Sequence, residues 1–303
     1  MKKKILIRSI CTILALCVFA GMAMASGSSS SVDQDIKSVG TTADKNNETS
    51  VTTTEEKGTT IEEQVLVDQD DVKITAKSMS SSLFGPELKI LIENDSDTDL
   101  IIQTRNASVN GYMVDTMISE EVAAGKKSNT SITFSAQALS ECGITTFTEM
   151  EFYFHVFTQD DWETYFDSDV INVKTSAYGS YEQEIDDSGE VFYDEDGIKI
   201  IGKGLSNNDS IFGPGLIVYI ENNTDTDFTV QVRDTSVNGF MIDTIMSEDV
   251  AAGKKAITAV TFFKSDLEEN EITIITSIET SFHVFDMDGW DTIVDTDPIT
   301  INF

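Results

Sequence analysis

Apolar and polar residues alternate along most of the chain beyond residue 64, with a period of two and not the 3.6 of a helix. A period of two places every apolar side chain of a run on one face of a β-strand. The clearest apolar faces are Val72, Ile74 and Ala76; Leu88, Ile90 and Ile92; Thr130, Ile132 and Phe134; Met150, Phe152, Phe154 and Val156; and Phe228, Val230 and Val232. The pattern predicts a chain of short strands that each bury one face.

Turn residues separate these runs. Asn-Gly at 110–111 favours a type I′ hairpin, because both central residues of that turn need a positive φ. One helical turn is expected at 265–270, where Ser265 and Glu268 form a capping box and Leu267, matched by Leu139, anchors it to the core.

The most informative feature is an internal repeat without gaps from Leu83 to Thr175. The segments that recur at one constant offset are Leu83-Phe84-Gly85-Pro86 with Ile211-Phe212-Gly213-Pro214, Ser108–Met113 with Ser236–Met241, Val122–Lys127 with Val250–Lys255, Phe154–Phe157 with Phe282–Phe285, and Trp162 with Trp290. Upstream the offset shortens by two, which places a loop near 206–210. Each unit is long enough to fold on its own core.

About seven short strands in about 110 residues, each with one apolar face, must pair two sheets face to face. The predicted fold is all-β, with two tandem immunoglobulin-like antiparallel β-sandwiches that each carry one short helical turn. The first repeat is expected at 65–175, a linker at 176–190 and the second repeat at 191–303.

The N-terminus has the features of an export signal. Lys2, Lys3 and Lys4 precede an apolar run, and Ala23-Met24-Ala25 offers a cleavage site. We therefore expect a signal peptide at 1–25. Residues 26–64 are rich in Ser, Thr and charged residues, which predicts a disordered tether.

Two cysteines bear on processing and on redox state. Lipidation of Cys17 is an alternative to cleavage, but Leu16 stands where a lipoprotein signal has a small residue. After cleavage at Ala25 only Cys142 would remain, so no internal disulfide is expected. Asn270 stands at the equivalent place in the second repeat, so the fold does not need a thiol there, and a buried or idle thiol is expected.

The chain resembles exported immunoglobulin-like proteins of unknown function from the cell envelopes of gut-type Firmicutes. The resemblance rests on the Lys-rich signal, the Ser/Thr-rich tether, the Phe-Gly-Pro-x-Leu and Ile-Glu-Asn segments and the Ala-Ala-Gly-Lys-Lys turn. These motifs are structural, so the resemblance implies a fold and a compartment and no activity.

The charge balance narrows the classes of partner. The chain has 53 Asp and Glu against 20 Lys and Arg, a formal net charge of -33. Such a surface repels phosphates at long range, so nucleic acid is not expected as a partner. Contact with a membrane is expected only through an uncleaved or lipidated N-terminus.

No motif with catalytic spacing is found, and the chain is predicted not to be an enzyme. His155 and Glu151 share a strand face but lie about 13 Å apart along an extended strand, so they cannot form a dyad. His155 is expected to be a surface or cross-strand histidine. A hydrolase remains the alternative of a different class.

Acidic turns are the best candidates for a ligand site. Ca²⁺ prefers roughly six to eight oxygen ligands, often from neighbouring loops. The candidate ligands are Asp95, Asp97, Asp99, Asp225, Asp227, Asp167, Asp169, Asp295 and Asp297. The first run lacks the Gly and Glu of an EF-hand, so the residue spacing does not identify a calcium site, and solvated turns are the alternative. No other cofactor is expected.

Trp162 and Trp290 recur in the same acidic loop. Each indole could plug the end of a sandwich core or stack on a sugar ring. The sequence therefore favours a non-catalytic secreted or cell-surface protein that binds a partner or serves as a spacer. Its partner would be an extracellular protein or glycan, and a calcium-dependent or carbohydrate-binding adhesion module is the alternative.

Overall fold

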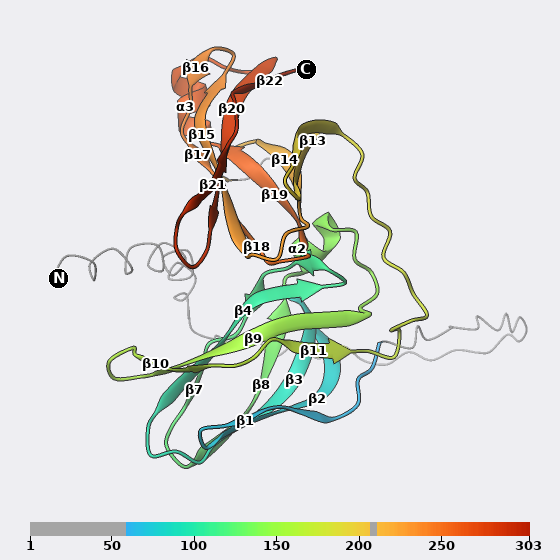
Figure 1. The fold of residues 1–303 in the computed structure, drawn as a ribbon, viewed down its shortest axis with the longest axis vertical. Helices are drawn as coiled ribbons and strands as arrows, with labels where there is room; N and C mark the ends of the chain where they lie inside the picture. The colour runs from blue at the N-terminus through green and yellow to red at the C-terminus, as the bar shows by residue number, and fades with distance from the viewer. Residues whose placement is uncertain (1–58, 207–210) are drawn as a thin grey trace, which may run out of the picture. The chain divides into compact units, whose positions relative to one another are not determined.

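The computed structural model describes residues 59–206 and 211–303, drawn in colour in Figure 1. Both repeats belong to one compact unit, Glu56–Phe303. The predicted signal peptide, Cys17, the tether up to residue 58 and most of the predicted loop at 206–210 lie outside the described residues. Neither helix in the described ranges has the length and apolar character needed to cross a bilayer.

The first repeat forms two antiparallel sheets (Figure 1). Its elements are β1 Gln64–Gln69, β2 Val72–Ser82, β3 Gly85–Asn94, β4 Leu100–Val109, β5 Tyr112–Met113, β6 Thr116–Met117, β7 Glu120–Val122, β8 Lys126–Phe134, α2 Ala136–Glu141, β9 Glu149–Thr158, β10 Thr164–Asp167 and β11 Ile171–Lys174. One sheet has the order β1-β2-β3-β8-β6, and the other is centred on β4 and β9, with β5, β7, β10 and β11 paired to them.

The second repeat has the same arrangement. Its elements are β12 Glu190–Glu195, β13 Ile198–Leu205, β14 Gly215–Asn222, β15 Phe228–Val237, β16 Phe240–Met241, β17 Thr244–Ile245, β18 Ser247–Val250, β19 Lys255–Phe262, α3 Lys264–Glu269, β20 Ser277–Asp286, β21 Thr292–Asp295 and β22 Ile299–Asn302. Strands β12, β13, β14, β19 and β17 form one sheet, and β15 and β20 form the centre of the other.

The alternating apolar faces predicted from the sequence are the faces that the sandwiches bury. Met150, Phe152, Phe154 and Val156 on β9 are fully buried, and β2 and β3 bury their predicted faces in the same cluster. A second cluster is centred on β14, β15, β19 and β20. The prediction of an all-β, immunoglobulin-like fold with one short helix in each repeat is confirmed.

The repeated Phe-Gly-Pro segment has a steric cause. Gly85 has φ +144, and a Cβ at this position would lie 2.0 Å from the carbonyl oxygen of Phe134. Gly213 has φ +134, and its Cβ would lie 2.1 Å from the carbonyl oxygen of Phe262. Only glycine lets β3 and β14 approach the end of the neighbouring strand this closely.

The Asn-Gly turn forms as predicted, whereas the capping box does not. Asn110 and Gly111 both have positive φ, and Val109 pairs with Tyr112 across the two-residue loop. Helix α3 begins at Lys264, one residue earlier than predicted, and its N-cap is Phe263, which makes no side-chain cap bond. In the first repeat Ser135 is the N-cap of α2 and accepts a hydrogen bond from the Ala138 amide. The prediction of a capping box at Ser265 is therefore wrong, because Phe263 takes the N-cap position.

The anchor leucines behave as predicted, and two boundaries shift by one residue, one of them because β12 begins at Glu190, the last residue of the predicted linker. Leu139 and Leu267 are buried under their short helices. Strand β1 begins at Gln64, so the last residue of the predicted tether belongs to the first sheet. Ile61 already packs against the first core, and the Ser176 amide donates to the Thr60 carbonyl at 2.8 Å.

The two repeats touch through one face of each. The Lys255 amide donates to the Gly111 carbonyl at 2.9 Å, and Lys255 pairs with Tyr112 in a parallel bridge between β19 and β5. Tyr219 and Ile201 of the second repeat belong to the first hydrophobic cluster. The outer face of the β13–β14–β19 sheet therefore covers the β5 end of the first repeat.

Candidate ligand-binding site

The loop between β9 and β10 carries a tryptophan, and so does the equivalent loop between β20 and β21. In the β9–β10 loop the Thr158 amide donates to the Glu163 carbonyl at 2.9 Å, and the Trp162 amide donates to the Thr158 carbonyl at 3.2 Å. The β20–β21 loop repeats both bonds, from Asp286 to Asp291 and from Trp290 to Asp286, at 3.0 and 3.2 Å. The same backbone turn therefore presents both indoles.

Both tryptophans adopt a backbone conformation that is costly for their residue type. Trp162 has φ +61 and Trp290 has φ +62. The left-handed region costs about 1–2 kcal/mol for a residue with a Cβ, and glycine, asparagine or aspartate usually occupies it. Folding alone would favour glycine at this position, so the tryptophan is retained against a local cost in both copies.

The indoles are exposed, and each is held flat by a phenylalanine. Trp162 is 65% exposed and stacks on Phe157, with ring centroids 5.6 Å apart and planes 23° apart. Trp290 is 60% exposed and stacks on Phe285 at 5.5 Å and 16°. The interpretation of these tryptophans as core plugs is therefore wrong, because the left-handed turn directs the ring onto the outside of the hairpin.

A histidine extends the stack to three rings. The His155 ring lies 5.2 Å from Phe157, and the His283 ring lies 5.1 Å from Phe285. His155 Nδ1 lies 2.6 Å from an Asp167 carboxylate oxygen, and His283 Nδ1 lies 2.6 Å from Asp295. The prediction of a cross-strand histidine is confirmed, since Asp167 and Asp295 are the direct cross-strand neighbours.

The loops also hold ionised acids beside the indoles. Backbone N–H groups, that of Gly289 first and that of Asp291 after it, lower the pKa of Asp286. In the first repeat the Thr158 hydroxyl lowers the pKa of Asp161. Such a site offers an aromatic surface beside hydrogen-bond acceptors and repels anions. It suits a neutral ligand with hydroxyl groups.

Sequence reasoning found the tryptophans and missed the ring stack as a unit. The available signal was the spacing of His and Asp around the hairpin, which is the same at His155/Asp167 and His283/Asp295. His155 and Glu151 remain apart as predicted, because Glu151 instead pairs with Lys254.

The acidic turns at 94–99 and 222–227 are organised by asparagine. Asn94 is fully buried and donates to the carbonyls of Thr98 and Val122, each at 2.9 Å. Asn222 makes the equivalent bonds to Thr226 and Val250. A side-chain amide therefore satisfies the inner carbonyls of both turns, a role that the sequence pattern did not reveal.

The candidate calcium ligands are spread over different contacts. Asp99 accepts from the Ala124 amide and Asp227 from the Ala252 amide, each at 2.8 Å. Asp167 and Asp295 pair with histidine, and Asp97 accepts from the Thr98 hydroxyl. In the part of the chain that the structure describes, no three His, Cys, Asp or Glu side chains are placed to hold a metal ion together. Calcium binding stays a prediction.

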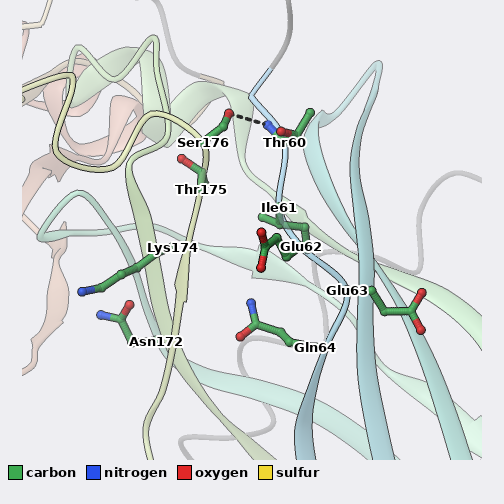
Figure 2. Close-up of a pocket in the computed structure, with 9 residues that line it drawn as sticks. All are labelled: Thr60, Ile61, Glu62, Glu63, Gln64, Asn172, Lys174, Thr175 and Ser176. Carbon is green, nitrogen blue, oxygen red and sulfur yellow. Dashed lines mark hydrogen bonds between the residues drawn. The ribbon is translucent and has the colours of Figure 1, made fainter.

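A separate groove of about 490 Å³ lies between the chain leading into β1 and the end of β11 (Figure 2). Its lining residues are Thr60, Ile61, Glu62, Glu63, Gln64, Asn172, Lys174, Thr175 and Ser176. Figure 2 shows Gln64 and Glu62 between the two segments, while Glu63 points away from them toward its partner Lys77. The groove is polar and does not include the tryptophan loops.

Comparisons with known proteins give no family. No family model and no curated protein matches the chain. A crystal structure of the YadV chaperone is 10% identical over 77% of this chain and 100% of its own, with a TM-score of 0.25. The Salmonella enterica SafA pilin in complex with the SafB chaperone is 10% identical over 78% of this chain and 98% of that one, with a TM-score of 0.23. Likenesses this distant say nothing of a ligand.

Proposed function

We propose that the chain is a non-catalytic extracellular binding protein whose two tryptophan loops each stack on a sugar ring of a glycan. One observation carries the proposal. Two exposed indoles occupy the same left-handed turn and are backed by the same Phe and His rings in both repeats. A solvent-exposed aromatic plane retained at a backbone cost is better explained by a ligand than by folding.

The surroundings of the indoles favour a neutral glycan over an anionic one. Asp161 and Asp286 are held ionised beside the rings, and the chain carries a net charge of -33. Carboxylates accept hydrogen bonds from sugar hydroxyls and repel sulfated or uronic chains. Two such sites on one chain would reinforce each other through effective concentration.

Affinity electrophoresis tests the proposal. The full chain would be run in native gels that contain xylan, galactomannan, mixed-linkage β-glucan or mucin. At least one neutral polysaccharide should retard the wild type. Trp162→Ala with Trp290→Ala should abolish the retardation, and each single change should weaken it by about tenfold or more through lost avidity.

The control is Tyr178→Ala, which removes an exposed aromatic ring outside both loops. This variant should migrate like the wild type in every gel. Equal retardation of the double tryptophan variant and the wild type would overturn the proposal. The proposal would also be overturned if none of the neutral polysaccharides retarded the wild type, a result that would favour a spacer.

Export to the cell surface of a Firmicute-type envelope is part of the same proposal and rests on the sequence of the first residues. The mass of the mature N-terminus tests it. Cleavage after Ala25 gives a chain that begins at Ser26, whereas lipidation gives one that begins at a modified Cys17.

A further inference from the structure

The second repeat exposes an apolar surface at the end marked by β16. We call this surface the distal face. It is formed by the exposed side chains Phe240, Met241, Ile245 and Ile274. The Asn238 side chain, next to β16, donates to the Ile274 carbonyl at 2.8 Å and so holds two parts of the face together. A recess of about 420 Å³ adjoins Met241, between Arg233–Thr235 and Met241–Thr244.

In the first repeat the second repeat covers the position equivalent to Phe240, which shows what fits there, whereas Met117, the equivalent of Ile245, stays 36% exposed. Tyr112, the equivalent of Phe240, is only 2% exposed, whereas Phe240 is 48% exposed. The cover is the outer face of β13, β14 and β19, where Ile201, Tyr219 and Ile257 form one cross-strand row. Ile201 and Tyr219 are buried in the first cluster, and Ile257 packs against it.

Polar contacts fix the register of this cover. The Lys255 amide donates to the Gly111 carbonyl at 2.9 Å, and the Lys254 ammonium pairs with Glu151. The Asn106 side chain donates to Asp227 at 2.9 Å. One cross-strand row of apolar side chains, one backbone bond and two polar pairs therefore define the contact.

The distal face keeps most of the receiving groups. Gly239 has φ +85 where Gly111 has φ +84, so its carbonyl belongs to the same type of turn. Glu279 is the exposed equivalent of Glu151. A partner that presents a lysine and a strand-edge amide in the spacing of Lys254 and Lys255 can therefore make the same contacts.

The first repeat presents that set of groups on the outer face of β2, β3 and β8, where the two equivalent lysines are exposed although Thr75 is buried. Lys126 and Lys127 are the equivalents of Lys254 and Lys255, and both are exposed on the edge of β8. The Lys127 side chain is 57% exposed, whereas that of Lys255 is 18% exposed. Leu91 replaces Tyr219 at the centre of the cross-strand row.

We propose that the distal face binds the outer face of β2, β3 and β8 in a second copy of the chain, so that copies join head to tail. Such a contact uses two different surfaces and leaves one of each free, so it extends to longer arrays. Because every added copy brings further tryptophan loops, an array would multiply the glycan sites proposed above, although the contact itself does not depend on them.

The contact between copies is weaker than the one inside the chain. Thr75 and Asn129 flank Leu91, where Ile201 and Ile257 flank Tyr219. Asp234 replaces Asn106 and would face Asp99, the equivalent of Asp227, so a hydrogen bond becomes a repulsion. Association should therefore need a high protein concentration and should increase with salt, which screens the acidic copies from one another.

Sedimentation velocity of the full chain tests the proposal. At 0.5 M NaCl the weight-average sedimentation coefficient should rise between 10 µM and 1 mM and should rise less at 0.05 M. Phe240→Ser with Met241→Ser should keep the monomer value throughout. These side chains are exposed, so circular dichroism should show an unchanged fold.

A charge exchange identifies the partner surface. Lys126→Glu should reduce association at least fivefold, and adding Glu279→Lys should restore it, whereas Tyr178→Ser should have no effect. A wild type that stays monomeric to 1 mM would overturn the proposal and would leave the distal face to another protein. So would association that persists in the Phe240/Met241 variant or that the charge exchange fails to restore.

Discussion

The equivalent residues Tyr112 and Phe240 show how position in the chain changes the role of one motif. Both follow Val-Asn-Gly, both start a two-residue strand after the same type of turn, and both pair with the valine before it. Tyr112 is buried because the second repeat covers it, and Phe240 is exposed because no described residue does so. The local sequence fixes the turn, and the neighbouring domain decides between core and surface.

The outer sheet faces of the two repeats also differ in burial. Tyr219 at the centre of the second repeat's outer face is fully buried, and burial raises the pKa of its phenol. Leu91 at the equivalent place is half-buried. The outer sheet face is therefore a contact surface in the second repeat and a more exposed surface in the first. Substitutions at the central residue of each face can measure this difference.

The largest difference is expected for truncation of these central residues. Tyr219→Ala removes a fully buried aromatic ring and should lower the free energy of unfolding by about 4 kcal/mol. Leu91→Ala should lower it by about 1 kcal/mol, because the side chain is half-buried. Guanidinium unfolding, with hydrogen exchange of peptides from each repeat, measures both. Equal losses would contradict the proposed difference between the two faces.

A change at the shared glycine should instead affect both repeats alike. Gly85→Ala and Gly213→Ala each force a Cβ against a carbonyl oxygen at a positive φ. Each should lower the free energy of unfolding by about 3 kcal/mol. Gly111→Ala is the steric control, because φ there is positive and no atom lies within 4 Å of the added Cβ. Losses at 85 and 213 no larger than at 111 would show that the close approach is not the cause.

Much of the fold could be predicted because the alternation of a β-strand and the residues of a tight turn can be recognised within a short stretch of sequence. The alternation at Met150–Val156 determines a buried face whatever lies beyond it, and Asn110-Gly111 determines its own turn. Cys142 is buried as expected, and burial raises the pKa of its thiol to about 12.

The remainder depends on contacts that are distant in sequence or on one backbone angle. The cover over Tyr112 comes from β13, β14 and β19, the first of which begins only at Ile198, so no local pattern predicts it. The exposure of Trp162 follows from its left-handed φ, which apolar character does not reveal. Ser265 looks like an N-cap, but the carbonyl of Phe212 accepts from the Lys264 amide, and the helix starts one residue early.

A smaller difference between the repeats is expected in how their stability depends on pH. Burial raises the pKa of Glu248 to about 8, and the nearby acids Asp115, Asp249 and Glu141 act in the same direction against a hydrogen bond from Thr258. The folded protein therefore holds a proton that the unfolded chain releases near pH 4.5. The stability that this proton contributes is complete below pH 4.5 and is lost as the pH rises through about 8.

Glu248→Gln should remove this dependence. At pH 9 it should raise the free energy of unfolding by about 2 kcal/mol, a value reduced for partial exposure, and below pH 4.5 it should change little. Glu120→Gln is the matched change in the first repeat, where Glu120 accepts from the Ser128 hydroxyl at 2.5 Å, and it should not stabilise the protein. Denaturant unfolding across pH 4–9 measures both. A constant difference between wild type and Glu248→Gln would contradict the assignment.

The smallest effect concerns the tryptophan loops, where the repeats should behave alike. Trp290→Gly loses a ring stack worth about 1 kcal/mol but relieves a left-handed residue by about the same amount, so stability should change by less than about 0.5 kcal/mol. Trp290→Ala loses the stack without the relief and should cost about 1 kcal/mol. The same pair at Trp162 should give the same gap, measured by denaturant unfolding. If glycine proves as costly as alanine in both loops, the backbone cost is absent, and with it the argument that a ligand keeps the tryptophans there.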